Sequence, residues 1–115
     1  MWPLLTVYYF MDFTKKKCVP CENGEGKLSI DKIKEYMPAA SDWLLAGDNL
    51  VKEFKFNNFK GSIKFINQVA DLAEKEGHHP DIYCFYDRVR LQLTTHAAHG
   101  LTENDFIMAA KINNL

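Results

Sequence analysis

The sequence has almost no net charge, and its basic residues are not gathered into a stripe. Its 115 residues include 14 lysines and arginines against 15 aspartates and glutamates, which gives a formal net charge of −1 at pH 7. Binding to a nucleic-acid backbone depends on concentrated positive charge. The balanced, scattered charge therefore argues against direct nucleic-acid binding.

Cysteines, leader sequences and cofactor-binding motifs are also scarce. Three cysteines cannot form a complete disulfide framework, so we expect a reducing compartment and a cytoplasmic protein. The apolar opening at residues 1–12 lacks a basic leader and is too short to span a bilayer, which predicts a tail outside the fold and no membrane association. The sequence contains no P-loop, no G-x-G-x-x-G and no G-x-S-x-G.

The remaining composition is that of a single globular domain. Hydrophobic residues make up 47% and charged residues 25% of the chain. This length leaves room for one core, so residues 13–115 are predicted to form one domain. Cys18 and Cys21 form a C-x-x-C, but no second C-x-x-C follows to complete a zinc site. We interpret them as two thiols in a mobile segment.

Hydrophobic periodicity and turn residues predict an α+β fold. The order helix, two strands, helix, two strands, helix favours a four-stranded antiparallel sheet with helices packed on one face. Gly77 should end the long second helix, whose apolar stripe contains Phe59, Ile63, Ile66, Val69, Ala70 and Ala73. The expected elements are a helix between Ser29 and Pro38, strands at 43–45 and 50–56, the helix at 59–76, strands at 82–87 and 89–94, and a helix beginning at Thr102.

All four histidines fall between residues 74 and 105. Alternation predicts a hairpin folded about Asp87 and Arg88, which pairs 82 with 93, 84 with 91 and 86 with 89. This register sets His79 opposite His96, with His78 beside them. Asp-Arg is a poor two-residue turn, so a longer turn and a register shifted by one remain alternatives. Histidines exchange protons near neutral pH, and such a cluster points to acid–base chemistry.

The face of the sheet that helices leave open should carry Tyr83 and Phe85. Aromatic side chains on an open face expose more apolar surface than a monomer usually tolerates. We therefore expect this protein to self-associate.

Several separated motifs together resemble the pterin-4a-carbinolamine dehydratases. They are the run H-H-P at 78–80, T-H at 95–96, G-L-T-E-N-D-F-I-M-A-A at 100–110, F-K-F-N-N-F at 54–59, Trp43 and Glu74, and the likeness covers roughly residues 27–113. The resemblance implies dehydration of 4a-hydroxytetrahydrobiopterin to quinonoid dihydropterin and water, in tetrahydrobiopterin recycling. Histidines would act as general acid and base, and neither a metal nor another cofactor would be required.

The resemblance also assigns roles to individual residues. His78, His79 and His96 would be the catalytic histidines, and Glu74 a carboxylate that helps to hold the site. The other residues implied to flank or bind the substrate are Pro80, Thr95, Ala97, Trp43 and Asp105. A capping box between Thr102 and Asp105 is an equal explanation for that aspartate. No role is carried over to His99.

Two other functions compete with the dehydratase. Mammalian relatives of the family act as dimerisation cofactors of a homeodomain transcription factor, which would add a protein partner and a nuclear location. The four histidines could instead bind a metal, although adjacent histidines rarely both ligate one ion. The resemblance further implies a homodimer or homotetramer.

Overall fold

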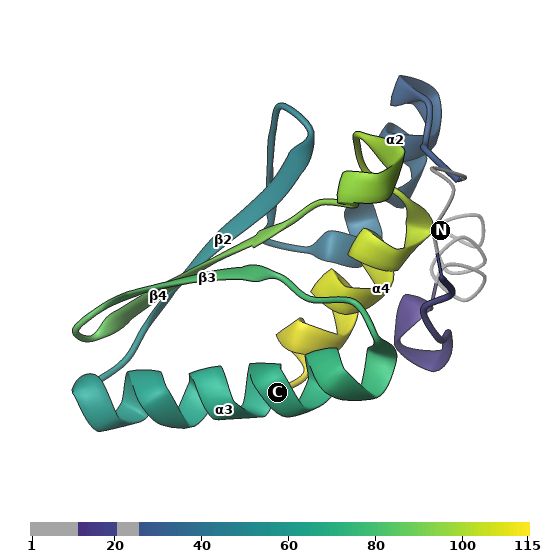
Figure 1. The fold of residues 1–115 in the computed structure, drawn as a ribbon. Helices are drawn as coiled ribbons and strands as arrows, with labels where there is room; N and C mark the ends of the chain where they lie inside the picture. The colour runs from purple at the N-terminus through teal and green to yellow at the C-terminus, as the bar shows by residue number, and fades with distance from the viewer. Residues whose placement is uncertain (1–11, 21–25) are drawn as a thin grey trace, which may run out of the picture.

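The computed structural model describes residues 12–20 and 26–115. Its elements, in chain order, are η1 (Phe13–Lys15), α2 (Ile30–Tyr36), η2 (Met37–Ala40), β1 (Leu44–Ala46), β2 (Asn49–Lys55), α3 (Phe59–Glu76), β3 (Asp81–Phe85), β4 (Arg88–Leu93), η3 (His96–Ala98) and α4 (Glu103–Asn113). Helices α3 and α4 lie on one side of a four-stranded antiparallel sheet with strand order β1-β2-β4-β3 (Figure 1). The predicted fold class is therefore confirmed. Of the predicted tail at 1–12, all but Asp12 lies outside the described residues.

Helix α3 begins and ends where the sequence predicts. Asn58 caps its start by accepting a hydrogen bond from the Gly61 amide at 2.8 Å. Gly77 ends it with a φ of +68°, a conformation that glycine adopts without strain. The predicted apolar stripe is wrong in part, because Phe59 and Ile63 are 49% and 36% exposed. The buried side includes two polar residues that a hydrophobic pattern misses, and it consists of Ser62, Phe65, Val69, Ala73 and Glu76.

The central hairpin forms, but in a different register from the predicted one. Residue 82 pairs with 91 and residue 84 with 89, so the predicted pairs and the ladder pairing of His79 with His96 are wrong. The turn lies at Tyr86 and Asp87. Tyr86 has a φ of +55°, and its ring stacks on that of Phe59 with centroids 6.3 Å apart. Because partners shift by two positions, each side chain keeps its predicted face.

The two strands of this hairpin differ in burial. Strand β4 is central, and its Val89, Leu91 and Leu93 are fully buried under the helices. Strand β3 is at the edge of the sheet, where Tyr83 and Phe85 alternate onto the opposite, open face and are 39% and 41% exposed. The predicted open aromatic face is therefore present.

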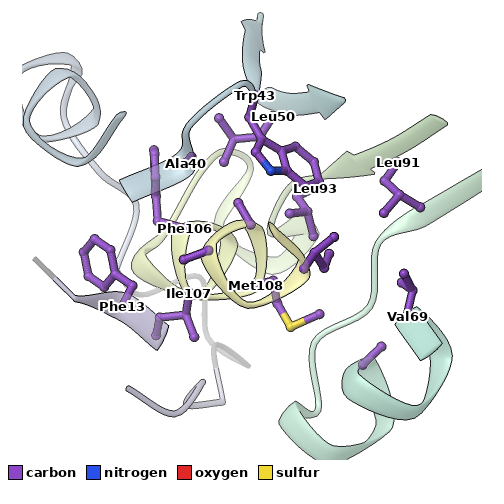
Figure 2. Packing of buried hydrophobic residues seen from close by; sticks show 14 of the residues in the cluster. Phe13, Ala40, Trp43, Leu50, Val69, Leu91, Leu93, Phe106, Ile107 and Met108 are labelled. Carbon is purple, nitrogen blue, oxygen red and sulfur yellow. The ribbon is translucent and has the colours of Figure 1, made fainter. Parts of the chain in front are cut away.

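Helix α4 forms the centre of the core. All its residues from 104 to 110 are buried. Figure 2 shows its apolar residues surrounded by side chains from the sheet, from α3 and from the N-terminal segment, among them Leu50, Leu91, Leu93, Val69 and Phe13. The first turn of α4 is consequently fixed from several directions.

The segment at residues 12–20 packs on the domain, which the sequence did not predict. Phe13 is 2% exposed, and its ring meets that of Tyr36 edge-on with centroids 5.0 Å apart. Cys18 is also buried. The interpretation of a mobile segment is therefore wrong for this thiol, whereas Cys21 lies outside the described residues. No helix in residues 12–20 or 26–115 is long and apolar enough to cross a membrane.

Candidate active site

A cleft of about 760 Å³ opens where α3 passes into β3 and β4 passes into η3. One part of its wall consists of predicted site residues, namely Glu74, His78, His79, Thr95, His96 and Ala97. The ends of two strands thus bring together histidines that are separated in sequence. Another part of its wall comes from Lys17 to Pro20 in the N-terminal segment, and the remaining lining residues are Lys75, Glu76, Gly77 and Thr94.

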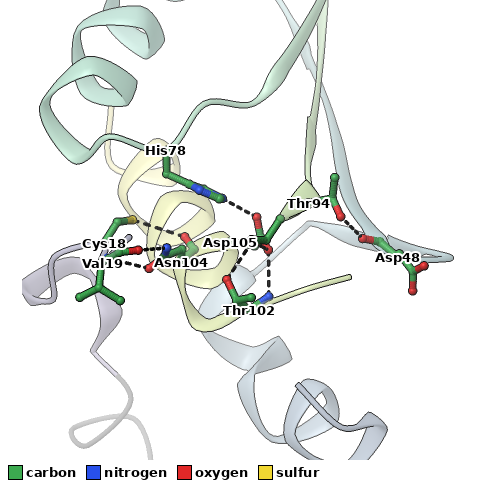
Figure 3. A network of polar contacts seen from close by, with 9 residues as sticks. Cys18, Val19, Asp48, His78, Thr94, Thr102, Asn104 and Asp105 are labelled. Carbon is green, nitrogen blue, oxygen red and sulfur yellow. Dashed lines mark hydrogen bonds and ion pairs between the residues drawn. The ribbon is translucent and has the colours of Figure 1, made fainter. Parts of the chain in front are cut away.

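His78 is held from inside the protein. Its Nε2 atom lies 2.6 Å from Oδ1 of Asp105, as Figure 3 shows. The Asp105 side chain is fully buried, while that of His78 is 12% exposed. The imidazole therefore has one nitrogen bound to a buried carboxylate at the inner end of the cleft.

Asp105 is itself fixed by hydrogen bonds to its second oxygen. Oδ2 accepts one from the Thr95 hydroxyl at 2.8 Å and one from the backbone N–H of Thr102 at 2.9 Å. The second bond is the half of the predicted capping box that the aspartate supplies. Asp105 therefore caps α4 and orients His78 at the same time, so the two interpretations of this residue are compatible.

His79 has a different environment. Its Nε2 atom lies 2.5 Å from Oε2 of Glu74, one turn earlier on α3. The side chains of His79 and Glu74 are 58% and 78% exposed. Pro80 follows directly, and it restricts the backbone of His79 to extended conformations. This histidine therefore lies at the open rim of the cleft.

His96 lies on a short closed loop. An antiparallel bridge between Thr95 and Gly100 closes that loop. The distances from each backbone nitrogen to the other residue's carbonyl oxygen are 3.1 and 3.4 Å. The Thr95 side chain is bound to Asp105, so the residue before His96 is fixed to the same carboxylate that holds His78. The two histidine positions are thus coupled through one aspartate.

Three predicted residues do not line this cleft. Trp43 is buried in the core, where its Nε1 donates to Asn113 at 3.0 Å. Pro80 is buried behind the rim, and Asp105 acts from beneath His78. His99, which has no predicted role, borders a smaller neighbouring pocket and has a φ of +55°.

Sequence reasoning missed the polar residues that attach the N-terminal wall. Glu76 accepts from the Cys18 amide at 3.0 Å and from Lys111 at 2.7 Å. Burial alone would raise the pKa of Glu76, but these hydrogen bonds prevail and the pKa is lowered. Burial raises the pKa of Cys18 to about 12. The C-x-x-C motif in this segment does not specify these contacts.

The described histidines do not form a metal-binding group. Within residues 12–20 and 26–115, no three His, Cys, Asp or Glu side chains are placed as ligands of one ion. His78 and His79 each face a separate carboxylate instead.

Known proteins are similar to this chain in both sequence and fold. The family described as "Pterin 4 alpha carbinolamine dehydratase" matches residues 26–115. A protein of Alkaliphilus metalliredigens, provisionally named pterin-4-alpha-carbinolamine dehydratase, is 43% identical over 104 residues, which are 89% of this chain and 94% of the relative. The mitochondrial pterin-4-alpha-carbinolamine dehydratase 2 of Arabidopsis thaliana is 40% identical over 110 residues, covering 90% of this chain and 59% of the relative.

A solved structure agrees with these sequence matches. The crystal structure of a transcriptional coactivator/pterin dehydratase from Brucella melitensis superposes with a TM-score of 0.73 at 34% identity, covering 77% of this chain and 97% of the other. The fold is thus that of a pterin dehydratase, which is a hydro-lyase. The chain belongs to the pterin-4a-carbinolamine dehydratase family.

Proposed function

We propose that this protein dehydrates 4a-hydroxytetrahydrobiopterin to quinonoid dihydropterin and water, in the recycling of tetrahydrobiopterin. The observation that carries the proposal is the cleft that His78, His79 and His96 line together. Family membership supplies the reaction class.

The chemistry requires two proton transfers and one bond cleavage. The N5 proton passes to a base, the N5 lone pair forms the C4a=N5 double bond, and the C4a–O bond breaks as an acid protonates the departing hydroxyl. Water is the only other product. Histidines can perform both transfers because each is competent as acid and as base near neutral pH.

The environments of the histidines suit a division of this work. His78 is partly buried and fixed by Asp105, which favours a positioned proton donor or acceptor beside the pterin ring. His79 is exposed beside Glu74, where it can exchange protons with solvent between turnovers. His96 lines the cleft from the segment that follows β4, whereas His78 and His79 precede β3. Glu74, Thr95 and Ala97 complete the proposed binding surface.

The decisive experiment is the dehydration of synthetic 4a-hydroxytetrahydrobiopterin, followed by ultraviolet absorbance against the spontaneous rate. We expect acceleration by the wild-type protein and its loss in a folded His78→Ala, His79→Ala, His96→Ala triple variant. Wild-type turnover in that variant, with unchanged circular dichroism, would disprove the histidine site. No acceleration by the wild-type protein would disprove the activity.

The family resemblance also supports proposals about setting and assembly. We place the protein in the cytoplasm as a homodimer or homotetramer, and we treat residues 1–12 as a tail before a domain at 13–115, of which Asp12 is to be kept because it caps η1. Deleting residues 1–11 should leave turnover unchanged, because Asp12 already accepts the hydrogen bond from the Thr14 amide that begins η1.

A protein-binding role is the second candidate. The observation that favours it is the Brucella relative, which is described as a transcriptional coactivator as well as a pterin dehydratase. Such a role would add a transcription-factor partner and a nuclear location. Dehydration by the purified chain alone would show that no partner is needed for catalysis.

A further inference from the structure

The family model does not include the N-terminal wall of the cleft, although the match to the Alkaliphilus relative, which covers 89% of this chain, extends over it. The match to the family model begins at residue 26, whereas the wall consists of residues 17–20. This wall faces a cleft that the catalytic histidines also line. The family model therefore assigns no role to this wall.

The wall is built with fixed geometry. The side chain of Asn104 is a two-sided clamp: its Oδ1 accepts from the Val19 amide at 3.0 Å and its Nδ2 donates to the Val19 carbonyl at 2.5 Å. The Cys18 amide donates to Glu76, and its thiol donates to the Asn104 carbonyl at 3.6 Å. Figure 3 shows this attachment to the first turn of α4, the turn that also carries Asp105.

Lys17 places a positive charge at the catalytic end of α3. Its Nζ donates to the Lys75 carbonyl at 3.0 Å, one of the last carbonyls of the helix, which have no partner within the helix itself. Gly77 then leads directly to His78 and His79. An ammonium has three N–H donors, so two remain after this bond.

The structure of the substrate places its substituent close to this wall. In a 6-substituted pterin the reacting N5 atom is bonded directly to C6. The substituent therefore leaves the ring beside the atoms that the histidines must reach, and it has to lie in the same cleft. Apart from the predicted site residues, the cleft is lined by residues 17–20, Lys75, Glu76, Gly77 and Thr94, and of these residues 17–20 form a wall from a separate segment.

We propose that residues 17–20 determine specificity for the 6-substituent of the substrate, with Lys17 donating a hydrogen bond to a hydroxylated substituent. The inference rests on the proposed dehydratase function. The proposed enzyme would prefer a substrate with a dihydroxypropyl substituent over one with a methyl group, because only the former can accept a hydrogen bond from the Lys17 ammonium.

The experiment compares kcat/KM for 4a-hydroxytetrahydropterins that carry a 6-dihydroxypropyl or a 6-methyl group. In Lys17→Met, which keeps the apolar stem and removes the donors, the ratio of the two values should fall about five-fold, the effect of one hydrogen bond. Lys17→Arg should retain most of the wild-type ratio, because a guanidinium can also donate. Lys15→Met is the matched control, because this lysine lies two residues before Lys17 and does not line the cleft. The ratio of the two values should be unchanged in this variant.

Asn104→Ala provides an independent test, because it removes the clamp on Val19. We expect this variant to lose the same preference while still turning over the methyl substrate. An unchanged ratio in Lys17→Met would overturn the inference, whether or not Asn104→Ala folds. If the wild-type protein dehydrates neither substrate, the proposed function itself is wrong. This outcome differs from an unchanged ratio in Lys17→Met, which would contradict only the specificity proposal.

Discussion

His78 and Asp105 form a histidine–carboxylate pair that spans the boundary between the cleft and the core. The Nε2 to Oδ1 distance is 2.6 Å, and the carboxylate has no exposed surface. The same carboxylate caps α4 and binds Thr95. The position of the imidazole therefore depends on how α4 packs in the core.

Asp105→Asn should lower kcat on the order of 10²-fold, because an amide can donate where the carboxylate only accepts and so changes which nitrogen of His78 carries the proton. The pH dependence of kcat should shift as well, which loss of packing alone would not cause. Asp81→Asn, at an exposed position, is the control. An unaltered rate and pH profile would show that Asp105 only caps the helix.

His79→Ala and His96→Ala should each lower kcat on the order of 10²-fold, the usual contribution of a positioned proton-transfer group. Neighbouring imidazoles can substitute in part for one another, so the two losses need not add. His99→Asn should have little effect, and asparagine tolerates the φ of +55° at this position. A comparable loss in the His99 variant would contradict the proposed division of roles.

Glu76→Gln should destabilise the protein by about 3 kcal/mol at neutral pH, because it leaves the ammonium of Lys111 without its buried partner. The folded-state pKa of Glu76 is lowered, so its contribution is present above the ordinary glutamate value of about 4.3 and is lost as the pH falls through the lowered one. Urea unfolding should show the difference from wild type shrinking in acid. Exposed Glu35→Gln should change little, and a pH-independent difference would contradict the argument.

The thiols of Cys18 and Cys84 should differ sharply in reactivity. Burial raises the pKa of Cys18 to about 12, so almost no thiolate is present at pH 8, whereas Cys84 is exposed. Iodoacetamide should label Cys84 in the folded protein and Cys18 only after unfolding, as read by peptide mass spectrometry. Equal labelling rates would show that the N-terminal segment opens readily.

Self-association should depend on the open face of the sheet. Tyr83 and Phe85 are partly exposed there, and the guanidinium of Arg90 lies 4.6 and 5.3 Å from their ring centroids. Light scattering should give a mass above 13.3 kDa for the wild type. The double variant Tyr83→Ser, Phe85→Ser should have a lower measured mass than the wild type, whereas Leu115→Ser should not. A wild-type mass of one chain at micromolar concentration would refute this.

Local signals in the sequence were sufficient for most of the fold. The long helix follows from its periodicity and from Gly77, and α4 from the Thr102 cap, because these features act within a few residues of one another. The gathering of the histidines at two strand ends followed from the hairpin, even though its register was wrong. A shift by two positions keeps each side chain on its predicted face of the sheet, although its partners and the turn change.

The remaining features depend on contacts that no local pattern encodes. Ser62 and Glu76 face inward although both are polar, and Glu76 does so because Lys111 and the Cys18 amide satisfy its carboxylate. Trp43 resembles a site residue in sequence but is in the core. At the turn, Tyr86 stacks on Phe59, a contact that only the folded chain brings about.

The docked N-terminal segment has a consequence for the order in which the protein assembles. The contacts that arrange the histidines join residues 5, 10 and 27 positions apart, whereas those of Lys17, Cys18 and Val19 span 58, 58 and 85 positions. Closing longer loops costs more chain entropy and slows folding. On the ribosome, Lys75 and Glu76 of α3 are synthesised before Asn104 of α4, so the clamp on Val19 is the last of these contacts to become available. From these sequence separations we expect the surface proposed to select the substrate to form after the contacts that arrange the histidines.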